Sequence, residues 1–147
     1  MFAPGDFASK PIDPLKPRRK GNYIGAPAVF ALEMACQQIC EAYTSGQHYA
    51  GLYLVGSCLE RPNWRDVDVR LIMDDAQFTR EFPDAGPVDH GRWEFDPKWL
   101  LLTISISAHL SKLTGLPIDF QFQPQSHANA RHHGRRNALG MHFAKGT

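Results

Sequence analysis

Two stretches of the chain carry apolar residues at helical spacing. From Pro27 to near Gly46, apolar residues recur every three or four positions and polar residues occupy the other face. This period predicts an amphipathic helix. The second stretch begins at Asp96, an N-cap residue followed by Pro97, and keeps the same period until Gly115. Proline at the first helical position and glycine just past the last are usual helix ends, so a second helix is predicted between them.

Three short segments have the pattern of β-strands. Residues 49–56 are an apolar run with aromatic and branched side chains, and residues 66–73 and 117–123 alternate between two faces. A period of two predicts strands that bury one face. The side chains predicted to face away from the core are Asp66, Asp68, Arg70 and Ile72 in the second segment and Asp119, Gln121 and Gln123 in the third.

The two ends of the chain differ from its centre. Residues 1–26 contain four prolines and three glycines and predict an extended N-terminal arm. Residues 27–123 hold the predicted helices and strands, including a short helix at 74–83 and a loop at 84–95. Residues 124–147 are polar and basic, with four of the seven histidines, and predict a solvated C-terminal segment. The fold class expected is a single α/β (α+β) domain, with a small mixed sheet and helices packed on one face.

Length and composition are those of one soluble domain. The chain has 147 residues, 43% hydrophobic and 21% charged, which suffices for a hydrophobic core without cross-links. Cys36, Cys40 and Cys58 are an odd number without the CxxC spacing of zinc sites, so they are expected to be core thiols. Prolines interrupt the N-terminus where a signal peptide needs a continuous apolar stretch. A cytoplasmic, reducing location without a membrane partner is expected.

The formal net charge of +1 conceals an uneven distribution. Ten of the 15 acidic residues fall between Glu60 and Asp96, whereas residues 10–20 carry five basic residues and residues 120–147 carry four and no carboxylate. An acidic centre between basic ends suits a protein that binds cations and phosphates together. Nucleic acid is a second candidate ligand of the basic ends, because clustered cations attract any polyanion. Phosphate contacts and a merely solvated surface are the two interpretations of Arg131, Arg135 and Arg136.

Three aspartates on the predicted polar faces have the spacing of metal ligands. Asp66 and Asp68 are two positions apart on one strand, so both project from the same face with backbones about 6.6 to 6.8 Å apart. Asp119 joins them if the third strand lies beside the second with its acidic face on the same side. Two Mg²⁺ ions held by such carboxylates, about 3.5 to 4 Å apart, can bind the attacking and leaving oxygens of a phosphoryl transfer. The competing interpretation is three exposed carboxylates on the wet face of a sheet.

Gly56 and Ser57 end the first predicted strand, where a tight turn can present backbone amides and a hydroxyl to a phosphate. Gly-Ser alone is a common turn. A longer order is more specific: an apolar strand, Gly-Ser, eight intervening residues, an acidic strand that begins Asp66-Val67-Asp68, and Asp119 on a later strand. This order resembles the nucleotidyltransferase superfamily that includes DNA polymerase beta. The match covers residues 27–123 and is closest in size to the small, single-domain members called minimal nucleotidyltransferases.

The resemblance implies a role for each matching position. Asp66 and Asp68 would ligate two Mg²⁺ ions, with Mn²⁺ as the alternative; Asp119 would hold the catalytic ion and help to activate the acceptor hydroxyl. Gly56-Ser57 would bind the phosphates of a nucleoside triphosphate such as ATP. The implied reaction transfers a nucleoside monophosphate to an acceptor hydroxyl, and pyrophosphate leaves. RNA, a protein hydroxyl and a small molecule are the candidate acceptors, and a partner chain or a homodimer could complete the site.

The chain departs from the family pattern immediately after Gly-Ser. Small members usually carry Arg and Gly there, whereas this chain has Cys58, Leu59 and Glu60. This departure supports a second hypothesis, a nucleotidyltransferase-like module without catalysis that binds nucleotide, RNA or a partner protein. Arg70 shares a strand face with the aspartates, so it could instead neutralise them. The residues that could replace the missing phosphate contact are Arg61, Arg65 and Arg70.

Overall fold

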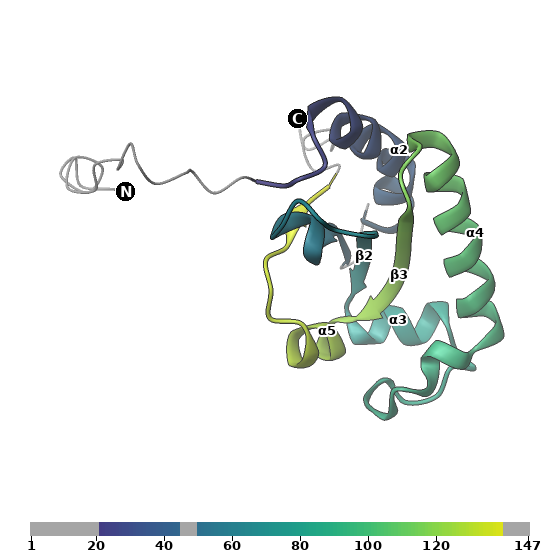
Figure 1. The fold of residues 1–147 in the computed structure, drawn as a ribbon. Coiled ribbons are helices and arrows are strands. Elements are labelled where there is room, and N and C mark those ends of the chain that lie inside the picture. Colours follow the sequence, from purple (N-terminus) through teal and green to yellow (C-terminus); the bar gives the residue numbers. More distant parts are fainter. Residues whose placement is uncertain (1–20, 45–49, 140–147) are drawn as a thin grey trace, which may run out of the picture.

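Residues 21–44 and 50–139 are described by the computed structural model, in which helices pack around a four-stranded sheet (Figure 1). The helices are α2 (Ala26–Thr44), α3 (Asp75–Glu81), α4 (Pro97–Thr114) and α5 (Gln125–Arg131). The strands are β1 (Ala50–Val55), β2 (Val67–Met73), β3 (Ile118–Pro124) and β4 (Asn137–Ala138). Three short 3₁₀ helices lie between them: η1 (Ser57–Leu59), η2 (Val88–His90) and η3 (Arg92–Phe95).

The sheet is mixed, and its strands follow the order β3-β2-β1-β4. β2 runs parallel to β3 and antiparallel to β1, and β4 pairs antiparallel with β1. The register places Asp68 directly beside Asp119. The predicted α/β class and the mixed sheet are thereby confirmed, and the condition set for Asp119, that the third strand lies beside the second, is met. The sequence did not predict β4, because two residues are too few to show a period.

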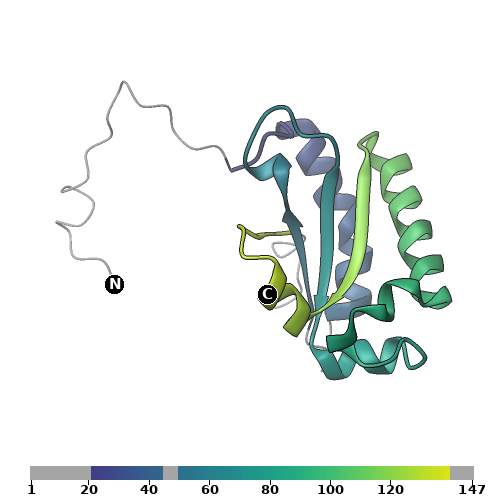
Figure 2. The ribbon, with the colours of Figure 1, turned by 60° about the horizontal axis from the view of Figure 1, so that its bottom comes forward.

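The apolar face of the sheet packs against α2 and α4 (Figure 2). Val67, Val69 and Leu71 of β2 and Phe120 and Phe122 of β3 are completely buried there. Burial of such a side chain stabilises the fold by about 1.5–3 kcal/mol. The two long helices therefore lie on one face, as predicted. The short helix α5 lies on the opposite, polar face, which the prediction did not include.

The ends of α4 follow the capping rules read from the sequence. The Asp96 side chain accepts a hydrogen bond of 3.0 Å from the Trp99 amide, Pro97 occupies the first turn, and Gly115 at φ +73° ends the helix. The left-handed conformation at Gly115 carries no penalty because glycine has no Cβ. The first predicted helix is α2, and Gly46, its predicted end, lies outside the described residues.

The prediction of a loop at 84–95 is wrong in part. This segment contains η2 and η3, and Trp93 within it is completely buried. The Trp93 ring contacts those of Phe78 and Trp99 edge to face, each with centroids 5.4 Å apart. A single aromatic anchor produces no periodicity, so a stretch rich in Gly, Pro and Asp conceals it.

The prediction of a solvated segment at 124–147 is wrong for its first half. Gln125–Arg131 form α5, and the Leu139 amide donates a hydrogen bond of 2.8 Å to the Leu52 carbonyl. Residues 140–147 lie outside the described part of the chain, as do residues 1–20 of the predicted N-terminal arm. At the described end of that arm, the Tyr23 amide donates a hydrogen bond of 2.7 Å to the carbonyl of Cys58 in η1.

Cys36, Cys40 and Cys58 are buried and form no disulfide bond, which confirms that they are core thiols. Burial raises the pKa of Cys36 to about 12 and that of Cys58 to about 11. These two thiols therefore stay protonated at neutral pH and are poor nucleophiles. Among the helices of the described residues, none combines the length and apolar character that crossing a membrane requires.

Candidate functional site

Asp68 and Asp119 lie side by side on the polar face of the sheet. They are paired in the parallel register of β2 and β3, and such neighbouring strands are about 4.8 Å apart. Their side chains are 25% and 44% exposed. Both are held in place by neighbours such as Val67 and Phe120, which are buried on the other face. Rigid strands thus present two carboxylates to one spot, as the alternation predicted.

The Arg70 guanidinium lies between these two carboxylates. Its Nη2 is 3.7 Å from Asp68 Oδ1 and 3.5 Å from Asp119 Oδ2. Its Nη1 donates hydrogen bonds to the backbone oxygens of Asp119, at 2.6 Å, and of Val69, at 3.1 Å. These bonds fix the plane of a side chain that is only 12% exposed. Arg70 is therefore the counterion of the acidic pair, one of the two roles that its position in the sequence suggested.

The charges around Asp68 do not balance fully. Burial raises the pKa of Asp68, Arg70 lowers it, and the carboxylates of Asp119 and Asp66 raise it again. The net shift is upward, so the ionised form of Asp68 is less favourable here than in water. A second cation at this spot would stabilise the ionised form.

Asp66 lies exposed in the bend that precedes β2. Within the described ranges, no three His, Cys, Asp or Glu side chains stand close enough to hold a metal ion together. The chemistry of the donor set still fits a hard cation, because Mg²⁺ prefers carboxylate oxygens and the repulsion at Asp68 would be relieved. Asp68 and Asp119 already have suitable positions, and Asp66 would have to turn toward them.

Gly56 is in direct contact with the Asp68 carboxylate. It has φ +82°, and a Cβ built on it would overlap Asp68 Oδ2. Only glycine lets the turn approach the acid so closely. Ser57 follows in η1, where its carbonyl accepts hydrogen bonds of 3.0 Å from the amides of Glu60 and Arg61. The Gly-Ser turn thus ends beside the acidic pair, at the place that the sequence suggested.

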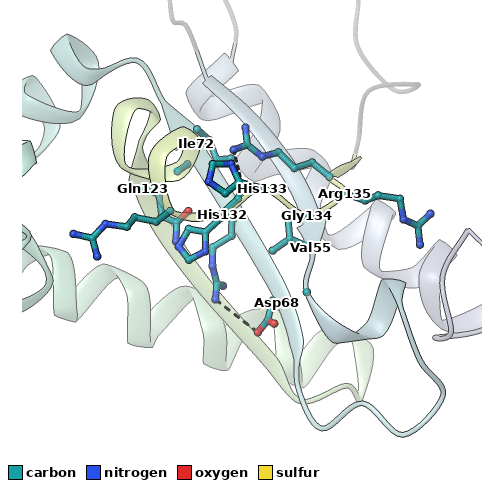
Figure 3. Close-up of a pocket in the computed structure, with 13 residues that line it drawn as sticks. Val55, Asp68, Ile72, Gln123, His132, His133, Gly134 and Arg135 are labelled. Atoms are coloured by element: carbon teal, nitrogen blue, oxygen red, sulfur yellow. Dashed lines mark hydrogen bonds and ion pairs between the residues drawn. The ribbon is translucent and has the colours of Figure 1, made fainter.

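A cavity of about 400 Å³ opens over this site (Figure 3). Gly56, Asp68 and Arg70 line it from the sheet, and the segment from Arg131 to Arg136 lines it from the other side. Ligand pockets usually measure about 300–1,000 Å³. Of the acidic pair, Asp68 lines the cavity together with its counterion Arg70, whereas Asp119 does not line it. The segment from Arg131 to Arg136 forms a basic wall, which suits a ligand with phosphates.

The sequence did not place the basic wall at this site. Arg131, Arg135 and Arg136 were recognised as a cluster, but no spacing linked them to the acids. Leu139 was the available signal, since an apolar residue after a polar stretch can mark the return of the chain to the core. Arg61 and Arg65, the other candidates for phosphate binding, are exposed in the turn before β2 and do not line the cavity.

No protein-family model, curated protein or solved structure matches the chain. The function is therefore argued from the site itself, because a fold class alone supports many activities.

Proposed function

We propose that this chain is a metal-dependent nucleotidyltransferase of the superfamily that includes DNA polymerase beta, and that it works in the cytoplasm. The observation that carries the proposal is the convergence of Asp68, Asp119 and Gly56 at one point of the sheet. Asp68 lies on β2, Asp119 on β3 and Gly56 in the turn after β1. Their proximity in space is therefore evidence beyond the order of the motifs along the sequence. The three buried thiols, which form no disulfide bond, support the proposed cytoplasmic location.

In the proposed reaction, an acceptor hydroxyl attacks the α-phosphorus of a nucleoside triphosphate. The new bond joins the acceptor oxygen to that phosphorus, the bond to the oxygen that bridges to the β-phosphate breaks, and pyrophosphate leaves. The hydroxyl proton passes to the half-exposed carboxylate of Asp119 or to water. Mg²⁺ or Mn²⁺ held by Asp66, Asp68 and Asp119 would neutralise charge on the phosphoryl oxygens.

Calorimetric titration with ATP, in MgCl₂ and in EDTA, tests this proposal. We expect wild-type protein to bind ATP more tightly with Mg²⁺, and Asp68→Ala to lose this difference. Asp84→Ala is the matched control, because Asp84 is exposed in the loop after α3 and should leave the difference intact. Binding that is independent of metal and indifferent to Asp68→Ala would rule out the proposal.

The position of Arg70 favours a second candidate, a catalytically inactive relative that binds nucleotide, RNA or a partner protein. In that case Arg70 replaces the metal as the permanent counterion of Asp68 and Asp119. ATP would then bind equally well in EDTA and in MgCl₂. The same titration therefore separates the two candidates.

A further inference from the structure

The basic wall of the cavity is fixed to the sheet at its far end. Asn137 and Ala138 pair with Leu54 and Tyr53 of β1, and Leu139 is only 2% exposed. The five residues before β4 must therefore cross the polar face in a defined path. Figure 3 shows His132, His133 and Arg135 from this segment on the same side of the sheet as Asp68.

Arg135 ties the wall to the turn after Gly-Ser. Its Nε is 3.3 Å from Glu60 Oε1, and its Nη2 donates a hydrogen bond to the Leu59 carbonyl. Leu59 and Glu60 belong to the stretch Cys58–Glu60 just after Gly-Ser, where small members of the superfamily that the chain resembles usually carry Arg and Gly. The turn therefore has a positive charge beside it after all. That charge belongs to Arg135, which is far from the turn in the sequence.

Arg131 and Arg136 form no ion pair with a carboxylate of the described residues. Arg131 makes no hydrogen bond or ion pair within residues 21–44 and 50–139. Arg136 Nη2 donates only to neutral oxygens, Asn129 Oδ1 at 3.1 Å and the His132 carbonyl at 3.4 Å. Both arginines are among the residues that line the cavity, so their charge is available to a ligand there.

The potential in the cavity is positive on this side. Burial lowers the pKa of His132, and the charges of Arg70, Arg136, Arg131 and His133 lower it further. Such a site repels an additional proton and attracts an anion. Guanidinium groups also match the geometry of phosphate oxygens, which they can bind in pairs of hydrogen bonds.

We propose that Arg131 and Arg136 bind the triphosphate of the donor nucleotide over the acidic pair, in place of the arginine that the Gly-Ser turn lacks. This inference rests on the proposed function, since it assigns the donor's phosphates to the cavity that holds Asp68. The nucleotide would lie between the wall and the sheet, with its reacting phosphate toward Asp68 and Asp119. A linear polyanion would contact Arg131 and Arg136 directly. A bound cation would bridge it to the carboxylates on the sheet.

Inorganic tripolyphosphate, titrated calorimetrically into the full chain in EDTA, tests the wall without the metal site. We expect the double variant Arg131→Gln/Arg136→Gln to bind about a hundredfold more weakly, or about tenfold for each lost charged contact. Arg80→Gln is the matched control, because Arg80 is exposed on α3 and does not line the cavity. Unchanged melting temperatures show that the variants fold, and Arg→Lys at both positions should restore part of the affinity.

Equal affinity of wild type and the double variant for tripolyphosphate would overturn the inference. So would a single-stranded oligonucleotide whose binding is lost in the double variant while tripolyphosphate binding is unchanged, because the arginines would then contact nucleic acid. Failure of the proposed function looks different: tripolyphosphate binding would still depend on the arginines, while ATP binding would show no dependence on Mg²⁺ or Asp68.

Discussion

The Asp68 carboxylate lies against Gly56 so closely that a Cβ at position 56 would overlap Asp68 Oδ2. The turn after β1 and the acid on β2 therefore depend on each other. The turn needs a residue without a side chain, and the acid needs the space that this residue leaves.

Gly56→Ala should destabilise the protein by about 1–3 kcal/mol through the left-handed backbone at φ +82°, and further through the overlap with Asp68. Gly86→Ala separates the two effects, because Gly86 has φ +81° but no atom within 4 Å of an added Cβ. Urea unfolding of both variants measures the difference. Equal losses in the free energy of unfolding of the two variants would show that the overlap with Asp68 adds no destabilisation.

Asp68→Asn should stabilise the protein at neutral pH when stability is measured in EDTA. The pKa of Asp68 is raised above its ordinary value of 3.8, chiefly by burial. A raised folded-state pKa gives stability that is present below the ordinary pKa and lost as pH rises through the folded one. Asparagine cannot ionise, so the variant avoids this loss. Its advantage should disappear below about pH 3.8 in urea unfolding curves.

The alternation of apolar and polar residues predicted the part of the site that lies on strands. A period of two places Asp68 and Arg70 on one face of β2 and Asp119 on one face of β3, whereas the pairing of the two strands entered the predicted site only as a condition. The register that sets Asp68 exactly beside Asp119 arises from packing of the two strands, and no local pattern contains it. Asp66 was predicted on the strand but lies one residue before it, because strand ends are not fixed by alternation.

The basic wall could not be predicted by the same reasoning. Its position depends on β4, a two-residue strand, and on the contact of Arg135 with Glu60, residues 75 positions apart. Both are long-range contacts that leave no periodic signal. Sequence patterns therefore identified Asp68 and Arg70 on the sheet side of the cavity and the charge of its wall, but not that the two sides face each other.

Arg70→Gln should strengthen binding of Mn²⁺ to the protein in the absence of nucleotide. The variant removes the guanidinium that lies 3.7 Å from Asp68 Oδ1 and 3.5 Å from Asp119 Oδ2, so both carboxylates lose a competing cation. We expect an increase in affinity of about tenfold, the effect of one charged contact of this kind. Electron paramagnetic resonance of free Mn²⁺ measures it, with Arg80→Gln as the control. Affinity that is no higher than in wild type would indicate that these carboxylates do not hold the metal.

Tripolyphosphate binding should strengthen as pH falls from 7 to 5, and His132 should contribute to this change. Burial and the surrounding cations lower the pKa of His132 below its ordinary value of 6.5, so the free protein keeps this imidazole neutral at pH 7. A bound polyanion offsets Arg131, Arg136 and Arg70, which raises the pKa of His132 and favours proton uptake with the ligand. His132→Gln should therefore flatten the pH dependence, whereas His109→Gln, on the exposed side of α4, should leave it unchanged. Protonation of tripolyphosphate itself affects the wild type and both variants equally. Identical pH profiles of the three proteins would therefore show that His132 takes up no proton when the ligand binds.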